Sequence, residues 1–180
     1  MSVGPECVTL PGKPRYDHSM SETIRVQRIA SFDPAKLSQA RGADERKRGA
    51  GHPRPTPRVS QSELEARTGI NRSVISAIEN GRVPVGATML RQLAKGLGVH
   101  PGELCSPPAD PTLRDLRDVQ AMTSVDVATA TGMTPSKLFV LERGGVAKLK
   151  PGDRKALAQA LAVNEAQVDA AYAASRQRRG

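Results

Sequence analysis

The sequence predicts an all-α protein built from two similar helical domains in tandem. Aromatic residues make up 2% of the 180 residues, which excludes a large aromatic-filled core, sandwich or barrel. Residues 60–81 and 123–144 align without a gap, and both stretches carry helix-capping residues and helix-ending glycines at matching places. An internal repeat of this kind indicates two copies of one helical unit.

The two copies match at the positions that shape the unit. The matched pairs are Ser60 and Thr123, Glu63 and Asp126, Leu64 and Val127, Gly69 and Gly132, Asn71 and Thr134, Ile75 and Leu138, Ile78 and Leu141, Glu79 and Glu142, and Gly81 and Gly144. One extra residue in the second copy then shifts the register, and the apolar pattern continues to Val99 and Val163. We therefore expect the same order of helices in both copies.

The middle of each copy is predicted to be a helix, a tight turn and a second helix. In the first copy, Ser60 caps the first of these helices, and Glu63 places a negative charge at its positive end. Gly69 permits the left-handed conformation that ends this helix after about two turns. Asn71 then caps the second helix, which stops at Gly81. This order is the helix-turn-helix signature.

Three further helices complete each copy, and their leucines are expected to close the core. The expected ranges are 34–41, 86–97 and 101–104 in the first copy and 113–119, 152–161 and 165–172 in the second. Glu79 and Glu142, near the ends of the second helix-turn-helix helices, are expected to anchor hydrogen bonds or ion pairs within their own domains.

Irregular segments rich in Arg, Gly and Pro flank and separate the two copies. The expected organisation is a disordered N-terminal segment at 1–31, a first domain at 32–104 with a basic loop inserted at 42–58, a Pro-rich linker at 105–111, a second, degenerate domain at 112–172 and a basic tail at 173–180. A short extended stretch is expected around Ile24–Ile29, and Met20 is an alternative start of translation.

The net charge of +9 lies mostly outside the two predicted cores. Residues 41–58 hold six basic and two acidic residues, and three arginines follow Tyr172. A basic balance favours a polyanionic partner. The stretch 41–58 is either a loop without a role or an arm that contacts phosphates or the minor groove.

Both copies resemble the Cro/CI-type, or xenobiotic-response-element-like, helix-turn-helix DNA-binding regulators. The resemblance rests on VSQSELEARTGINRSVISAIENGRVP and LRQLAKGLGV in the first copy, and on LRDLRDVQAMTSVDVATATGMTPSKLFVLERGG in the second. It implies two five-helix, lambda-repressor-like domains in which the third helix lies in the major groove of double-stranded DNA. It also implies a sequence-specific transcriptional regulator of the repressor type.

Carried over position by position, the resemblance assigns DNA contacts to the first copy. The base-reading positions are Asn71, Arg72, Ser73, Ser76 and Ala77, and the phosphate-contacting positions are Gln61, Asn80 and Arg82. Because guanine accepts two hydrogen bonds from an arginine and adenine pairs with an asparagine, Arg72 is expected to read guanine and Asn71 adenine. The phosphate contacts fix the position of the protein on the duplex.

The second copy departs from this pattern on its reading face. The positions equivalent to the base-reading set hold Thr134, Pro135, Ser136, Phe139 and Val140, and those equivalent to Gln61 and Arg82 hold Ser124 and Gly145. Ser136, Lys137 and Arg143 remain for auxiliary DNA contacts. Phe139 and Val140 are expected to form a protein interface, because exposed apolar pairs on small domains mark such contacts. The second copy is therefore expected to serve packing or formation of a homodimer.

No motif indicates an enzyme, a cofactor, a metal site or a domain that senses a small molecule. The sequence has no Gly-rich phosphate loop after a strand, and His18, His52 and His100 are scattered. Cys7 and Cys105 form no metal-binding pair and are expected to be reduced thiols. No stretch approaches the roughly 20 apolar residues that span a bilayer, and no signal segment is visible. A cytoplasmic, nucleoid-associated location is expected.

Two other functions compete with the regulator. One is a protein-interaction adaptor, or an antitoxin-like protein, that uses the helix-turn-helix fold to bind a protein. The other is a sequence-independent nucleoid protein, which is disfavoured because the excess charge lies in irregular segments while the first copy keeps a polar reading helix. The salt dependence and the sequence preference of DNA binding distinguish these functions.

Overall fold

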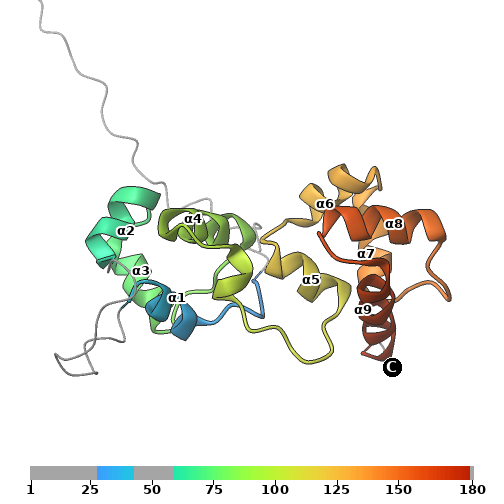
Figure 1. Cartoon of the computed structure of the whole chain (residues 1–180), viewed down its shortest axis with the longest axis horizontal. Helices are drawn as coiled ribbons and strands as arrows, with labels where there is room; N and C mark the ends of the chain where they lie inside the picture. Colours follow the sequence, from blue (N-terminus) through green and yellow to red (C-terminus); the bar gives the residue numbers. More distant parts are fainter. Residues whose placement is uncertain (1–27, 43–58, 179–180) are drawn as a thin grey trace, which may run out of the picture.

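A computed structural model of the chain describes residues 28–42 and 59–178, which form nine α-helices and one 3-10 helix (Figure 1). The first copy contains α1 (Pro34–Ala40), α2 (Gln61–Thr68), α3 (Arg72–Glu79), α4 (Ala87–Leu97) and the 3-10 helix η3 (Pro101–Leu104). The second contains α5 (Leu113–Val119), α6 (Ser124–Thr131), α7 (Pro135–Glu142), α8 (Pro151–Ala160) and α9 (Glu165–Gln177). The all-α prediction is confirmed. None of the described helices is long and apolar enough to cross a membrane.

The caps and turns expected from the sequence form in both copies. The Ser60 hydroxyl accepts a hydrogen bond from the Glu63 backbone N–H at 3.0 Å, and α2 ends at Gly69, whose φ is 72°. Asn71 then caps α3, and its side chain accepts a hydrogen bond from the Ser73 backbone N–H at 2.9 Å. The second copy repeats this arrangement, with threonine caps before α6 and α7 and a left-handed glycine between the two helices.

Each copy has its own apolar core, built from residues three and four apart on the inner faces of its helices. Buried core residues include Leu64, Ile75, Ile78, Leu90 and Leu93 in the first copy and Val127, Leu138, Leu141, Leu157 and Leu161 in the second. All of these side chains are buried. The cores hold the helix-turn-helix pairs, α2–α3 and α6–α7, against the helices that follow them.

The first domain begins earlier than the expected start at residue 32. Ile29 is buried in the first core, and its backbone N–H donates to the Val85 carbonyl at 2.9 Å. Beside it, Arg28 and Gly86 form an isolated β-bridge. The last residues of the segment expected to be disordered therefore belong to the fold, because contacts with a distant part of the chain fix them. Of the expected extended stretch, only this end is within the described residues.

The second domain ends later than expected. Helix α9 continues to Gln177, so most of the segment 173–180, which was expected to be a tail, is helical. Ala174 and Ser175 in this extension are buried against the rest of the second copy. The predicted basic loop lies outside the described residues from position 43 to 58.

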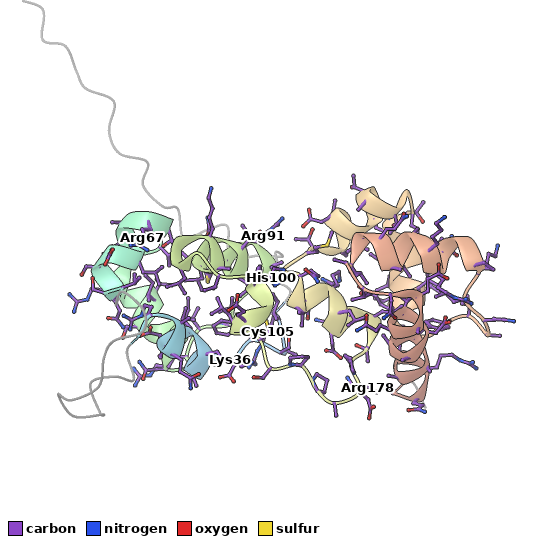
Figure 2. All side chains as sticks on the ribbon, viewed as in Figure 1. Lys36, Arg67, Arg91, His100, Cys105 and Arg178 are labelled. Carbon is purple, nitrogen blue, oxygen red and sulfur yellow. The ribbon has the colours of Figure 1, made fainter. Side chains whose placement is uncertain are left out.

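The two copies touch through the turn between α5 and α6. Val119 and Ala121 belong to the second copy, yet both pack into the core of the first, and Ala121 is fully buried. Arg91 of α4 forms an ion pair with Asp126 of α6, with 3.2 Å between Nη2 and Oδ2. Figure 2 shows Arg91 on the side of the first copy that faces the second. The turn between α5 and α6 is therefore part of both domains.

Candidate nucleic-acid interface

Helix α3 divides into a buried apolar side and a polar side. Ile75 and Ile78 are fully buried in the first core. The expected base-reading residues lie on the remaining surface, with Asn71, Arg72 and Ser73 exposed and Ser76 and Ala77 half-buried. The structure thus brings the five expected residues together on one helix face.

Arg72 is the first residue of α3, where its side chain is exposed. It forms no ion pair with any residue in the described part of the chain. Its planar guanidinium group therefore retains the donors that a bidentate contact to guanine requires.

Asn71 has fewer hydrogen-bonding groups available for DNA than Arg72. Its Oδ1 atom accepts two hydrogen bonds from Ser73, from the backbone N–H at 2.9 Å and from the hydroxyl at 2.7 Å. A bidentate contact to adenine would need this same oxygen. With Oδ1 committed to the helix cap, the Nδ2 amide is the group of Asn71 that remains to donate.

The three expected phosphate-contacting residues flank the recognition helix. Gln61 Nε2 donates to Glu79 Oε2 at 2.6 Å, and Asn80 Nδ2 donates to the Ser76 carbonyl at 2.7 Å. Each amide group keeps one further N–H. Arg82 is exposed just beyond the end of α3 and is the cationic member of the set.

Glu79, at the end of α3, binds side chains from the end of α1 and the start of α2. Arg41 Nη2 donates to Glu79 Oε2 at 3.1 Å, and Arg41 Nε binds the other carboxylate oxygen. Arg41 Nη1 also donates to the Val59 carbonyl at 2.9 Å, just before the cap of α2. The expectation that Glu79 serves an internal ion pair agrees with these contacts. Gln61 is held by the same carboxylate, so the pair also positions one expected phosphate contact.

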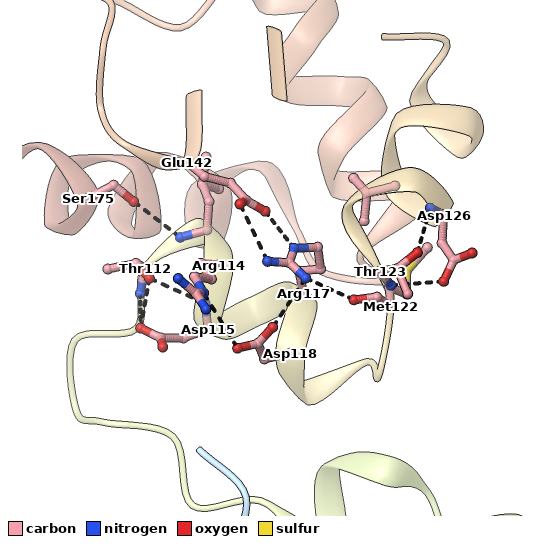
Figure 3. A network of polar contacts seen from close by, with 12 residues as sticks. Thr112, Arg114, Asp115, Arg117, Asp118, Met122, Thr123, Asp126, Glu142 and Ser175 are labelled. Carbon is pink, nitrogen blue, oxygen red and sulfur yellow. Dashed lines mark hydrogen bonds and ion pairs between the residues drawn. The ribbon is translucent and has the colours of Figure 1, made fainter. Parts of the chain in front are cut away.

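The second copy has an equivalent arginine–glutamate ion pair, which Figure 3 shows. Arg117 Nε donates to Glu142 Oε1 at 2.6 Å, and Arg117 Nη1 donates to the Met122 carbonyl at 3.0 Å. The position of Gln61 is taken by Ser124, which makes no hydrogen bond to Glu142 among the described contacts. The internal pair therefore survives in the second copy, whereas its link to a phosphate-contacting side chain does not.

Asp118 lies beside this second pair and close to the first domain. Its Oδ1 is 3.3 Å from Arg117 Nη1, while Oδ2 has no hydrogen-bond partner and is 3.9 Å from Arg114 Nε. Burial raises the pKa of Asp118 from 3.8 to about 6, because removing the carboxylate from water outweighs the attraction of Arg117 and Arg114.

The outer face of α7 is largely apolar. Phe139 is 57% exposed and Val140 is 42% exposed. Of the expected auxiliary contacts, Ser136 is exposed, and Lys137 is held by Asp153 with 2.6 Å between Nζ and Oδ1. The Arg143 guanidinium carbon lies 5.3 Å from the centroid of the Phe139 ring. Within the described residues, Arg143 is thus the cation of this face that has no carboxylate partner.

Arg41 is the residue whose role sequence reasoning missed, because it was counted among the charges of the basic stretch 41–58 and its pairing with Glu79 was not expected. Seventeen residues separate Arg41 from Val59, whereas four separate Arg117 from Met122. The inserted residues conceal the fact that both arginines stand at the same place in the repeat. Realigning the first helices across the insert would have revealed the match.

Comparison with known families agrees with the repeat. A family model described as helix-turn-helix matches residues 58–104, and one described as a helix-turn-helix domain matches residues 112–171. Both matches are consistent with the resemblance to Cro/CI-type regulators. No curated protein and no solved structure matches the chain significantly.

Proposed function

Because the chain carries two tandem helix-turn-helix domains, we propose that it is a sequence-specific DNA-binding transcriptional regulator that reads the major groove with α3. The observation that carries this proposal is the polar, exposed face of α3, on which Arg72 has no ion-pair partner within the described residues. A repressor role and a cytoplasmic, nucleoid-associated location are part of the same proposal.

In this proposal each base-reading residue makes a distinct contact. Arg72 donates two hydrogen bonds to a guanine, and Asn71 donates from Nδ2 to a single acceptor. Ser73 and Ser76 offer hydroxyl groups, and Ala77 offers a methyl group to a thymine methyl. Gln61, Asn80 and Arg82 bind phosphates and set the position of α3 in the groove.

The second copy acts as an accessory domain in this proposal. Its exposed apolar pair, Phe139 and Val140, supports self-association into a homodimer. Arg143 and Ser136 serve as auxiliary DNA contacts. Lys137 contributes less, because Asp153 already neutralises its charge.

Selection of bound DNA from a random pool tests the proposed reading helix. The wild-type protein should enrich one sequence, and Arg72→Ala should lose the preference for guanine at one position, a change of about 1–3 kcal/mol in discrimination. Lys155→Ala is the matched control, because it removes an exposed positive charge from α8 and leaves α3 intact. If the wild-type protein enriches no sequence, the proposed function is wrong.

The proposed dimer interface is tested by the mass of the protein in solution. The double substitution of Phe139→Ser and Val140→Ser should convert a dimer into a monomer. Val125→Ser is the control, because Val125 is 61% exposed on α6 and lies outside the proposed interface. An unchanged mass in the double variant would contradict self-association through α7.

The same apolar face supports one alternative function, a protein-interaction adaptor or antitoxin-like protein. Salt dependence separates the two proposals. A regulator that uses about six phosphate contacts should lose roughly a thousandfold in affinity between about 50 and 200 mM salt while keeping its sequence preference. An adaptor should bind DNA weakly and without sequence preference, and should bind a protein tightly.

A further inference from the structure

A cleft of about 850 Å³ lies between the two copies. Its walls come from the first residues of the first domain and from α5, α7 and α9 of the second. The residues that matter most are four arginines and one aromatic ring, namely Arg28, Arg114, Arg143, Arg178 and Phe139. No residue of α3 lines the cleft, so it is separate from the proposed reading helix.

The carboxylates at the cleft are already neutralised by neighbouring groups. Asp115 Oδ2 accepts from the Thr112 backbone and hydroxyl at 2.8 Å and lies 3.2 Å from Arg178 Nη1. Glu142 is held by Arg117, which lies behind the cleft wall. The two acidic groups therefore do not cancel the remaining positive charge.

Two of the four arginines have no carboxylate partner in the described part of the chain. Arg28 and Arg143 are both exposed, and neither forms an ion pair there. They come from different copies, so an anion bound between them would contact both domains. Arginine guanidinium groups are well suited to this because their planar geometry matches phosphate oxygens.

The aromatic ring adds a second kind of recognition. Phe139 is 57% exposed, and the Arg143 guanidinium carbon is 5.3 Å from its ring centroid. A planar base can stack on an exposed aromatic ring while its phosphate contacts a nearby cation. An inorganic anion would leave this ring unused.

We propose that the interdomain cleft is a nucleotide-binding site, in which Arg28 and Arg143 hold a phosphate and Phe139 stacks on the base. The phosphate and base come either from a free nucleotide or from a nucleotide of single-stranded DNA, whose base is unpaired. The site does not depend on base reading by α3, because it shares no residue with that helix. It uses Phe139 of the face proposed for self-association, so a nucleotide and a second copy of the chain compete for this ring.

Calorimetric titration of the full-length protein tests the free nucleotide as the source. The probes are adenosine monophosphate, adenosine and inorganic phosphate. Adenosine monophosphate should bind, and the double variant Arg28→Ala and Arg143→Ala should lower its affinity about tenfold or more. The control replaces Lys148 and Lys155, two exposed lysines outside the cleft, by alanine and should leave the affinity unchanged. Phe139→Leu should weaken adenosine monophosphate but not inorganic phosphate.

A short single-stranded oligonucleotide of mixed sequence tests DNA as the source, because its bases are free to stack on Phe139. If the strand supplies the phosphate, the slope of log affinity against log salt should fall in magnitude by about 1–2 in the double arginine variant and less in the lysine control. The proposal is overturned if neither probe responds to the arginine substitutions, or if both double variants respond equally. Equal binding of inorganic phosphate and adenosine monophosphate, with no effect of Phe139→Leu, overturns the nucleotide assignment. Arg72→Ala should alter the sequence selected from double-stranded DNA and leave the binding of adenosine monophosphate unchanged, so failure of α3 reading is distinguishable from failure of the cleft.

Discussion

Each copy closes its helix-turn-helix with a buried arginine–glutamate pair, and the two pairs make the same contacts. Arg41 and Arg117 each bind a glutamate at the end of the second helix and a backbone carbonyl just before the first. The side chains of the Arg41–Glu79 pair are 8% and 9% exposed. A buried pair need not stabilise a protein more than apolar residues would, but removal of one partner leaves the other charge buried without compensation.

Substitution of Glu79 by alanine should therefore destabilise the first domain by about 3 kcal/mol, because Arg41 would remain buried and unpaired. Urea denaturation followed by circular dichroism measures the change. Glu63→Ala is the control, because its ion pair with Arg67 is 45% and 44% exposed and is expected to contribute less than about 1 kcal/mol. Similar losses in both variants would contradict a structural role for the buried pair.

Asp118 should make stability fall as the pH rises. Its pKa is raised to about 6 in the folded protein, so between about pH 4 and 6 the folded state binds more protons than the unfolded state. The stabilisation is full below the unfolded pKa and is lost as the pH passes the folded pKa. The expected loss is on the order of 1–3 kcal/mol, since the group is buried and its shift reflects desolvation.

Asp118→Asn should remove this contribution, because the amide does not titrate. The measurement is the difference between the unfolding free energies of the wild type and the variant from pH 4 to 8. The contributions of the other carboxylates to the pH dependence are nearly the same in both proteins and largely cancel in this difference. Relative to the variant, the wild type should be more stable at pH 4 than at pH 8. A constant difference across this range would show that Asp118 has an ordinary pKa.

At the scale of helices, α2 and α4 approach each other closely at Gly96. A Cβ atom at this position would overlap Thr68 Cγ2 and lie 3.0 Å from Leu64 Cδ1. The Thr68 methyl group cannot turn away freely, because the Thr68 hydroxyl donates to the Leu64 carbonyl at 2.7 Å. Helix propensity alone would favour alanine in α4 by about 1 kcal/mol. The steric overlap between the two helices should outweigh this gain in helix propensity.

Gly96→Ala should therefore destabilise the first domain by about 1–2 kcal/mol despite its better helix propensity. The matched control is Gly152→Ala in α8, where an added Cβ meets nothing within 4 Å. That substitution should stabilise the second domain by about 0.5–1 kcal/mol. Thermal and urea denaturation of both variants measure the effects, and a stabilising Gly96→Ala would contradict the close packing of α2 and α4.

The helices were predictable from sequence where local signals define them. Thr112 and Thr123 carry capping boxes, and helices begin directly after them at α5 and α6. The end of α9 was missed, although Val168, Ala171, Tyr172 and Ser175 continue a helical spacing past the expected stop. Ile29 had no local signal, because only contacts with residues far along the chain bury it.

The candidate site likewise has features that the sequence predicts and features that it does not. The α3 face followed from the repeat and the resemblance, since both fix positions within one helix. The hydrogen bonds that commit Asn71 Oδ1 and Gln61 Nε2 depend on side-chain conformation, which no sequence pattern specifies. Arg41 was hidden by the insert between the first two helices.

At the scale of the whole molecule, the two repeats are joined by more than a linker. Ala121 and Val119 extend the first core, and an ion pair joins α4 to α6. The cleft between the copies could not be predicted, because Arg28 and Arg143 are far apart in sequence and line the same cleft only when both domains are folded and in contact. The contact between the copies therefore sets both the stability of the pair and the shape of the cleft.

This contact should make the two domains unfold together. Ala121 is fully buried in the first core although it belongs to the second copy, so loss of one domain would expose apolar surface of the other. Ala121→Asp would place a charge in that interface and should separate one urea transition into two.

Ala173→Asp is the control, because Ala173 is exposed on α9, and it should keep a single transition. When Tyr16 is replaced by Phe, tyrosine fluorescence comes from Tyr172 alone and reports on the second domain, and circular dichroism reports on both domains. Coincident transitions by the two probes in the Ala121 variant would show that the domains are not coupled through this turn.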